Sequence, residues 1–325
     1  MLTFCYVLIS FIAIIGNSLV MYVVLVSRRM QTVTNFYIAN LALSDVVLAL
    51  FCIPFQFRAA LIQRWDLPEF MCQFCPFMQT LSVSVVLECS SCSDSPLQVN
   101  VSVWTLVAIC IDRYQAIIRP LAKKQSKRTA RLVILGIWVA GGLTALPMGA
   151  AHTFQQVLDF DNGGLKPFCS VRWSSIEDEG EEEAGYLLLT LFQVYFVCLL
   201  LLEYLAPLSI ISLAYLKMGR KLWGAVTPGQ ADQMRDDKIL RNKKKVLHMM
   251  LIVVVVFSLC WAPWQSYSLA SIVYPAVNQW KYVNIMFFIF HWLAMSNSCY
   301  NPFIYGIYSV RRLGSPHIFP GAIQY

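Results

Sequence analysis

The sequence predicts an all-α membrane protein, a seven-transmembrane helix bundle with an extracellular amino terminus. Three observations predict this fold class. Of 325 residues, 58% are hydrophobic and 13% are charged, with a mean hydropathy of +0.59, whereas soluble domains carry about 25% charged residues. Seven apolar runs are long enough to cross a hydrocarbon core of about 30 Å. The basic residues gather on one side of these runs.

Polar segments separate the seven predicted spans. The first span is too long, and too lightly charged at its start, for a cleaved signal peptide. Basic segments follow the first, third and fifth spans, and a long polar loop over 152–185 follows the fourth. We expect one membrane domain over 1–308 and a short cytoplasmic tail over 309–325. The approximate bounds of the spans are 2–26, 33–61, 72–114, 132–150, 186–215, 246–274 and 281–308.

The distribution of Lys and Arg sets the predicted orientation. Twenty of the 25 basic residues lie in the loops and tail of one side, and this side is expected to be cytoplasmic. The amino terminus is then outside, and we expect a multi-pass protein of the plasma membrane. The five basic residues on the outer side are Arg58, Arg64, Lys166, Arg172 and Lys281.

Polar side chains within the spans are candidate functional residues, because charge inside a bilayer is costly and usually serves a function. Asp45 lies in the middle of the second span. We expect a polar cluster between helices, which acts either as a hydrogen-bonded packing network or as a binding site for a sodium ion. Its members are Asn17, Asp45, Ser102, Asn297, Ser298 and Asn301.

Composition and motifs argue against several other classes. No internal repeat is visible, which disfavours an inverted-repeat transporter. The spacing Cys72-x-x-Cys75 has no nearby ligand His, so we expect no metal site of the zinc type. The net charge of +7 reflects the cytoplasmic loops and gives no reason to expect a nucleic-acid partner.

Each of the seven spans carries a short motif. The third ends in Asp112-Arg113-Tyr114, and the seventh contains Asn301-Pro302-Phe303-Ile304-Tyr305. The others carry Gly16-Asn17, Leu41-Ala42-Leu43-Ser44-Asp45, Trp138, Pro207 with Tyr215, and Phe257-Ser258-Leu259-Cys260-Trp261-Ala262-Pro263. In this order the motifs resemble those of class A (rhodopsin-like) G-protein-coupled receptors. The resemblance implies a receptor with no catalytic site, which signals to a heterotrimeric G protein.

Within that family, the chain resembles receptors of the neuropeptide Y-like group, and invertebrate RYamide receptors in particular. Three strings carry this resemblance: Cys72-Gln73-Phe74-Cys75-Pro76-Phe77, Lys221-Leu222-Trp223, and the run from Phe290 to Tyr300. Tachykinin-type receptors share much of the last string and are the alternative. Gln79 replaces the Asp of aminergic receptors, and Met295 replaces the Lys that binds retinal in opsins.

The resemblance implies roles for individual residues. The ligand would be an amidated peptide, bound by Gln79, Glu203, Trp261, Gln265 and His291. Glu203 is the intramembrane carboxylate for a ligand Arg, or else pairs with a neighbouring polar side chain. Ile272 replaces the Asp of neuropeptide Y receptors. The cytoplasmic switch would consist of Asp112, Arg113, Tyr114, Tyr215, Asn301, Pro302 and Tyr305, and Cys72 would form a disulfide with Cys169.

The third span is too long for one helix. Cys72 and Arg113 are 41 residues apart, against about 25 in the family; at 1.5 Å per residue these lengths are about 62 and 38 Å. Without the 16 residues 84–99, which include Glu88, Asp94 and Pro96, a family-like helix is restored. We therefore expect an insertion at 84–99. It is either foreign sequence, which would make the chain a non-signalling mis-spliced relative, or a bulge extruded from the helix.

Overall fold

The computed structural model describes the chain except residues 1, 63, 83–100, 120, 122–124, 159–163, 172–189, 192, 196, 199, 224–232 and 314–325. Its helices are α1 (Leu2–Val26), α2 (Val33–Phe51), α3 (Ile53–Ile62), α4 (Glu69–Ser82), α5 (Val101–Ile118), α6 (Lys127–Ala151), α8 (Ala206–Trp223), α9 (Gln233–Val273) and α10 (Val283–Leu313). Short turns of helix occur at η1 (Arg28–Met30), η3 (Leu201–Leu205) and η4 (Pro275–Gln279). Two strands, β1 (His152–Leu158) and β2 (Leu165–Val171), complete the described elements.

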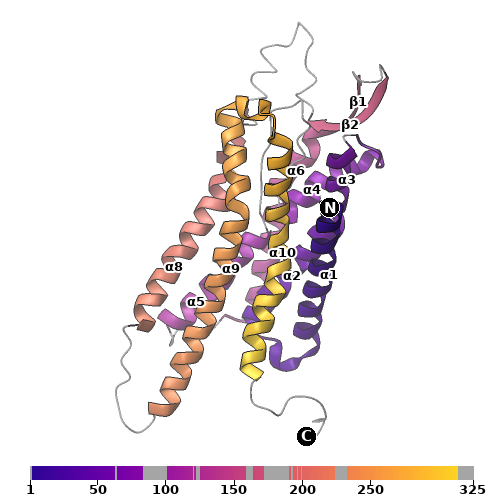
Figure 1. Ribbon diagram of the computed structural model, residues 1–325. Helices are drawn as coiled ribbons and strands as arrows, with labels where there is room; N and C mark the ends of the chain where they lie inside the picture. Colours follow the sequence, from indigo (N-terminus) through magenta and orange to yellow (C-terminus); the bar gives the residue numbers. More distant parts are fainter. Residues whose placement is uncertain are drawn as a thin grey trace.

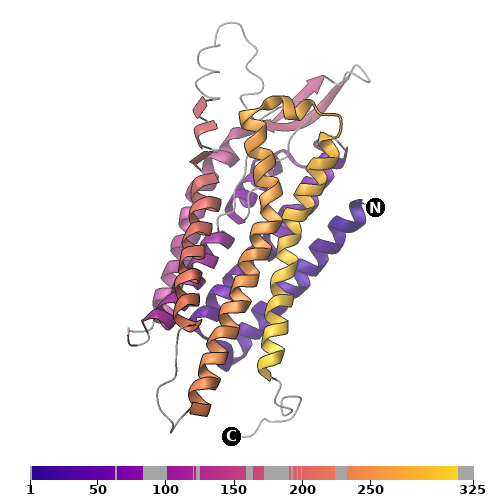
Figure 2. The ribbon, with the colours of Figure 1, turned by 60° about the vertical axis from the view of Figure 1, so that its left-hand side comes forward.

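The long helices lie side by side in one bundle (Figures 1 and 2). Within the described ranges, five helical stretches are long and apolar enough to cross a membrane: Leu2–Val26, Val33–Ala59, Val101–Ile118, Lys127–Ala151 and Leu240–Val273. Figure 1 shows η4 and the two strands at one end of the bundle, and the lower ends of α8 and α9 at the other. The predicted seven-transmembrane bundle is the observed fold.

The predicted second span is divided into two helices at Cys52. The N–H of Cys52 still donates to the carbonyl of Leu48, but its backbone departs from ideal helical angles, with φ −118° and ψ −59°. Pro54 follows two residues later and has no N–H to continue the ladder of hydrogen bonds. The proline therefore accounts for the break between α2 and α3.

Several helices extend beyond the apolar runs that predicted them. α6 begins at Lys127 because Ser126 caps it, its Oγ accepting a hydrogen bond of 3.1 Å from the Thr129 N–H. α9 begins at Gln233, 13 residues before the predicted start of the sixth span at 246.

The third span is described as α4 and α5, and the expected insertion at 84–99 lies outside the described residues. α10 continues to Leu313, so the helix passes the predicted end of the membrane domain at 308.

A π-helical turn, η3, lies within the predicted fifth span and leads into α8. It covers Leu201–Leu205 and ends two residues before Pro207. A π-turn accommodates one extra residue in a helix, and such turns often lie at functional sites. Glu203 lies in this turn, so the backbone irregularity coincides with the acidic residue of the fifth span.

The loop after α6 forms a β-hairpin, which the sequence did not predict. β1 pairs antiparallel with β2, from His152 opposite Val171 to Leu158 opposite Leu165. Cys169 on β2 forms a disulfide with Cys72 on α4, with 5.6 Å between their Cα atoms. This confirms the implied pairing. The Trp65 N–H also donates to the Pro167 carbonyl at 2.8 Å, so the hairpin is attached both to α4 and to the loop between α3 and α4.

Replacing Cys169 by Ser is expected to lower the free energy of unfolding by about 2–5 kcal/mol, because the disulfide restricts the unfolded chain. The bond links residues 97 positions apart in the sequence. Thermal inactivation of the detergent-solubilised protein measures the effect. Cys198→Ser, which removes an exposed free thiol, is the matched control. Equal thermal stability of the two variants would contradict the prediction.

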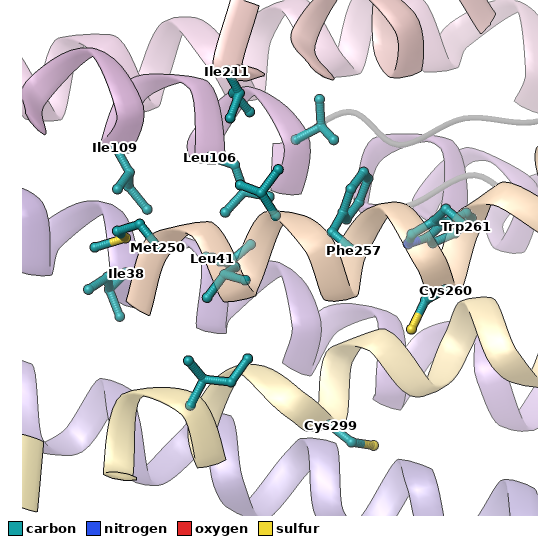
Figure 3. Packing of buried hydrophobic residues seen from close by; sticks show 14 of the residues in the cluster. Ile38, Leu41, Leu106, Ile109, Ile211, Met250, Phe257, Cys260, Trp261 and Cys299 are labelled. Carbon is teal, nitrogen blue, oxygen red and sulfur yellow. The ribbon is translucent and has the colours of Figure 1, made fainter. Parts of the chain in front are cut away.

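The hydrophobic core runs along the bundle between α2, α5, α8, α9 and α10. Figure 3 shows side chains from these helices meeting in one layer, among them Leu41, Leu106, Ile211 and Phe257. At the edge of the core α1 approaches α10 closely. A Cβ atom on Gly16 would lie 2.9 Å from Cγ of Pro302, which explains why a residue without a side chain stands at this crossing.

Candidate functional site

A buried polar cluster joins α1, α2 and α10 at mid-bundle. Asp45 is 1% exposed. One of its carboxylate oxygens accepts from Ser298 Oγ at 2.8 Å, and the other accepts from Asn301 Nδ2 at 3.0 Å. Asn17 Nδ2 donates to the Ser298 carbonyl at 2.9 Å. Direct hydrogen bonds thus join four of the six residues that were predicted for this cluster.

The other two predicted members, Ser102 and Asn297, lie at the margin of the cluster. Ser102 Oγ on α5 is 2.9 Å from Ser44 Oγ, which belongs to the residue beside Asp45. Asn297 is buried on α10 beside Ser298. The oxygen atoms of Asp45, Ser298 and Ser102 are of the kind that hard cations prefer.

The cytoplasmic end of α5 carries a charged pair. Arg113 Nη2 lies 2.6 Å from Asp112 Oδ2, and Thr34 Oγ1 of α2 donates to the same oxygen at 2.6 Å. Charge-assisted hydrogen bonds of this type are short and strong. Tyr114 is half-buried and packs against the core. Asp112 therefore fixes Arg113 on its own helix and also links α5 to α2.

The remaining predicted switch residues lie on α8 and α10. Tyr215 and Tyr305 are both buried. The Tyr305 hydroxyl has no hydrogen-bond partner among the described residues. Pro302 lies inside α10, one turn before Tyr305, and packs against Gly16. These residues are thus enclosed by the bundle rather than presented on its surface.

Two contacts that sequence reasoning did not predict hold the cytoplasmic ends of α5, α8 and α9 together. Lys221 Nζ donates to the Ile118 carbonyl at 2.7 Å. Lys244 Nζ lies 5.7 Å from the centroid of the Trp223 ring, a cation–π contact between α9 and α8. Lys221 and Trp223 both belong to the string Lys221-Leu222-Trp223, which carried the family resemblance. This string was the sequence signal that could have pointed to the two contacts.

In the other half of the bundle, buried polar atoms from α9 and α10 lack partners. Trp261, Gln265 and His291 are at most 5% exposed. Trp261 Nε1, Trp264 Nε1, Gln265 Oε1 and His291 Nε2 have no hydrogen-bond partner among the described residues. Trp264 packs its edge against the His291 ring, with 5.7 Å between centroids. Buried polar groups are nearly always satisfied, so these atoms mark a candidate ligand site.

For Gln79 and Glu203, the other two predicted ligand residues, the structure describes only the backbone. Their backbones lie in α4 and η3, but their side chains lie outside the described part of the chain. Sequence reasoning missed Tyr6, whose hydroxyl lies 2.7 Å from His291 Nδ1. The apolar span contains two tyrosines, Tyr6 and Tyr22, and its sequence gave no signal that Tyr6 would point inward.

An ion pair lies beside the mouth of the bundle. Arg58 on α3 forms a forked pair with Asp66 of the following loop. The hydrogen bond from the Arg58 guanidinium lowers the pKa of the Asp66 carboxyl. The carboxylate is therefore ionised, and the positive charge of Arg58 already balances it. Asp66 is therefore a poor acceptor for an arginine of a ligand.

Comparison with known proteins gives one family and several relatives. The model of the family described as 7 transmembrane receptor (rhodopsin family) matches residues 16–93 and 95–305. An RYamide receptor of Tribolium castaneum is 34% identical over 308 residues, covering 92% of this chain and 75% of the relative. The RYamide receptor of Drosophila melanogaster is 35% identical over 302 residues, covering 92% and 59%.

A tachykinin-like peptides receptor of Drosophila melanogaster is 32% identical over 292 residues, covering 89% of this chain and 51% of the relative. The chain thus spans about half to three-quarters of the length of these three curated relatives. The matched regions include the buried polar cluster, the charged pair and the candidate ligand site.

Proposed function

Because this chain belongs to the rhodopsin family of seven-transmembrane receptors, we propose that it is a G-protein-coupled receptor for an amidated neuropeptide of the RYamide type. Both RYamide receptors named above resemble it over nine-tenths of its length. This chain resides in the plasma membrane as a multi-pass protein, and its partners would be the peptide, a heterotrimeric G protein and the surrounding lipid.

The observation that carries the proposal is a set of neutral polar atoms on α9 and α10 that have no hydrogen-bond partner among the described residues. A primary amide has a carbonyl oxygen that accepts and an NH₂ group that donates. Gln265 Oε1 offers an acceptor, and the indole N–H groups of Trp261 and Trp264 offer donors. A carboxylate would carry its charge into a buried site where the described residues place no cation to pair with it, at a large cost. The site therefore suits an amidated terminus better than a free acid.

The adjacent Arg of an Arg-Tyr-amide or Arg-Phe-amide peptide requires a carboxylate. We propose Glu203 on η3 for this role, since Asp66 is already paired with Arg58. Gln79 on α4 is the second residue proposed to contact the amide. The acidic run 177–183, which lies outside the described residues, would attract a basic peptide and raise its association rate.

Signalling would follow as a shift between two states of the bundle. In the described state Asp112 holds Arg113. Peptide binding would favour a state in which the cytoplasmic end of α9 moves outward and Arg113 leaves Asp112 to contact the G protein. Tyr215, Tyr305 and the segment Asn301-Pro302 would complete the opened site. A sodium ion held by Asp45, Ser298 and Ser102 would favour the inactive state.

A tachykinin-like peptide receptor is the second candidate, since the tachykinin-like peptides receptor of Drosophila matches 89% of this chain. The two candidates predict different ligands, because the names of the relatives refer to different peptides. The preferred peptide therefore decides between them.

Calcium and cyclic-AMP responses of cells that express the receptor test the proposal. Cells should be challenged with amidated Arg-Tyr and Arg-Phe peptides, with tachykinin-like peptides, and with the free-acid form of each. The expected result is a response to the amidated Arg-Tyr peptides at the lowest concentration, and a response to their free acids only at concentrations at least about tenfold higher. Stronger activation by tachykinin-like peptides would favour the second candidate.

A further inference from the structure

Tyr6 on α1 holds the imidazole ring of His291 on α10. The Tyr6 hydroxyl lies 2.7 Å from His291 Nδ1, and each side chain is 2% exposed. The tyrosine ring is itself fixed, because it stacks on Phe57 of α3 with 4.3 Å between centroids and 20° between planes. Three helices therefore determine where the hydroxyl points.

The hydrogen of the Tyr6 hydroxyl has two acceptors within reach. His291 Nδ1 is at 2.7 Å, and the Phe288 carbonyl is at 3.4 Å. The 2.7 Å contact allows two arrangements: the hydroxyl donates to Nδ1, or a protonated Nδ1 donates to the hydroxyl, which then donates to the Phe288 carbonyl. Bonds donated by a hydroxyl are normally about 2.5–3.0 Å long, and the contact with the carbonyl is longer, so the geometry favours the first arrangement. A neutral imidazole has one protonated and one unprotonated nitrogen, and in the first arrangement the ring proton lies on Nε2.

The surroundings of His291 favour a neutral ring with a free donor. Its ring is stacked on Phe287, with 5.7 Å between centroids and 14° between planes, and Trp264 packs its edge against it. A charged imidazolium would be costly among these aromatic rings. His291 Nε2 has no hydrogen-bond partner in the described part of the chain. The ring therefore presents one N–H group that has no acceptor.

We propose that Tyr6 is a positioning residue for ligand recognition: it fixes His291 in the tautomer whose Nε2–H donates to the carbonyl oxygen of the ligand's terminal amide. The ligand part of this inference rests on the proposed function. His291 Nε2–H then donates a hydrogen bond to the carbonyl oxygen of the amide. Among the described residues, Gln265 Oε1 can accept a hydrogen bond from its NH₂ group. Tyr6 acts through His291 and needs no contact with the peptide.

The tautomer is tested first without any ligand. The chain contains four histidines, so ¹⁵N-histidine labelling of the full chain in lipid gives a small set of solid-state NMR signals. His291→Asn identifies the signals of this ring. The expected spectrum has an unprotonated Nδ1 and a protonated Nε2, and Tyr6→Phe should shift protonation towards Nδ1. A ring protonated at Nδ1 in the unmodified chain would overturn the proposal whatever the ligand.

Ligand binding provides the second test, made in the full chain and in the form that lacks residues 84–99. Tyr6→Phe keeps the ring and its stack on Phe57 but removes the hydroxyl. It should weaken binding of an amidated Arg-Tyr peptide about tenfold, and weaken binding of the peptide methyl ester by the same factor, because the ester retains the carbonyl. Tyr22→Phe, on the 62% exposed tyrosine of the same helix, is the matched control and should bind as the unmodified chain does.

A double-mutant cycle separates positioning from general stabilisation. In a His291→Ala background, Tyr6→Phe should cause no further loss of affinity, because the two residues act as one unit. Additive losses, unchanged affinity in Tyr6→Phe, or a loss seen with the amide but not the ester would each overturn the proposed role. Failure of every amidated peptide to bind either unmodified form would overturn the proposed function, while the NMR result would still decide the tautomer.

Discussion

Removal of residues 84–99 is expected to produce a receptor that responds to amidated Arg-Tyr peptides, while the full chain at the same surface level stays silent. Cys72 is fixed at the hairpin by its disulfide, and Arg113 lies at the other end of the bundle. A continuous helix between them would need about 62 Å in the full chain but about 38 Å after the deletion. Only the shorter length is compatible with one straight crossing of the membrane.

Further observations support this expectation. α4 ends at Ser82 and α5 begins at Val101, so the deletion would join two described helices almost directly. We propose that 84–99 is an insertion that separates the upper and lower parts of the third span.

The deletion should be compared with a control of equal length. Removal of residues 310–325 takes away 16 residues from the carboxy terminus and should not create a response. Calcium and cyclic-AMP signals, normalised to surface protein, give the comparison. Equal responses from the full and shortened chains would mean that the helix extrudes the stretch. Silence from both, at normal surface levels, would argue against the proposed ligand and leave the fold unaffected.

Arg113→Ala should abolish activation of the G protein while leaving peptide binding intact. The guanidinium is the group proposed to contact the G protein, and Ala offers no charge or hydrogen bond in its place. The ligand site lies in the opposite half of the bundle, so the substitution leaves its contacts unchanged. Peptide binding to membranes and nucleotide exchange on the G protein, measured on the same preparation, test both parts of this prediction.

Asp112→Asn is the informative partner of that variant. It keeps the shape of the side chain but weakens the pair with Arg113 and the bond from Thr34. A charge-assisted bond contributes about 1.5 kcal/mol, which is a factor of about ten in a two-state equilibrium. Basal signalling should therefore rise by up to about tenfold. If Arg113→Ala signals normally, or Asp112→Asn falls below the basal level, the described pair is not the switch.

The sequence predicts those parts of the molecule that follow from local pattern. The bounds of α1 agree with the apolar run because lipid contact requires apolar side chains along the whole helix. The motif residues Asp45, Ser298 and Asn301 were expected to lie together, and hydrogen bonds join them. Helix ends beyond the membrane were less predictable, because α9 continues through charged residues that no longer carry a hydrophobicity signal.

Long-range contacts are the part that sequence reasoning missed. The β-hairpin after α6 is held by a disulfide and by pairing across residues that show no strand pattern. The inward direction of Tyr6 depends on Phe57 and His291, which lie far away in the sequence. Among otherwise lipid-facing aromatic residues, only the packed bundle distinguishes a side chain that points inward.

The length of α9 gives it the properties of a mechanical lever. The helix extends from Gln233 to Val273 without interruption, with Pro263 inside it near the ligand end. Gln233 is 30 positions before the proline, a distance of about 45 Å along the axis. A bend of about 10° at Pro263 would therefore displace the far end by about 8 Å. Gln265 is two positions after the proline, about 3 Å along the axis, so the same bend would move the helix by only about 0.5 Å at this candidate ligand residue.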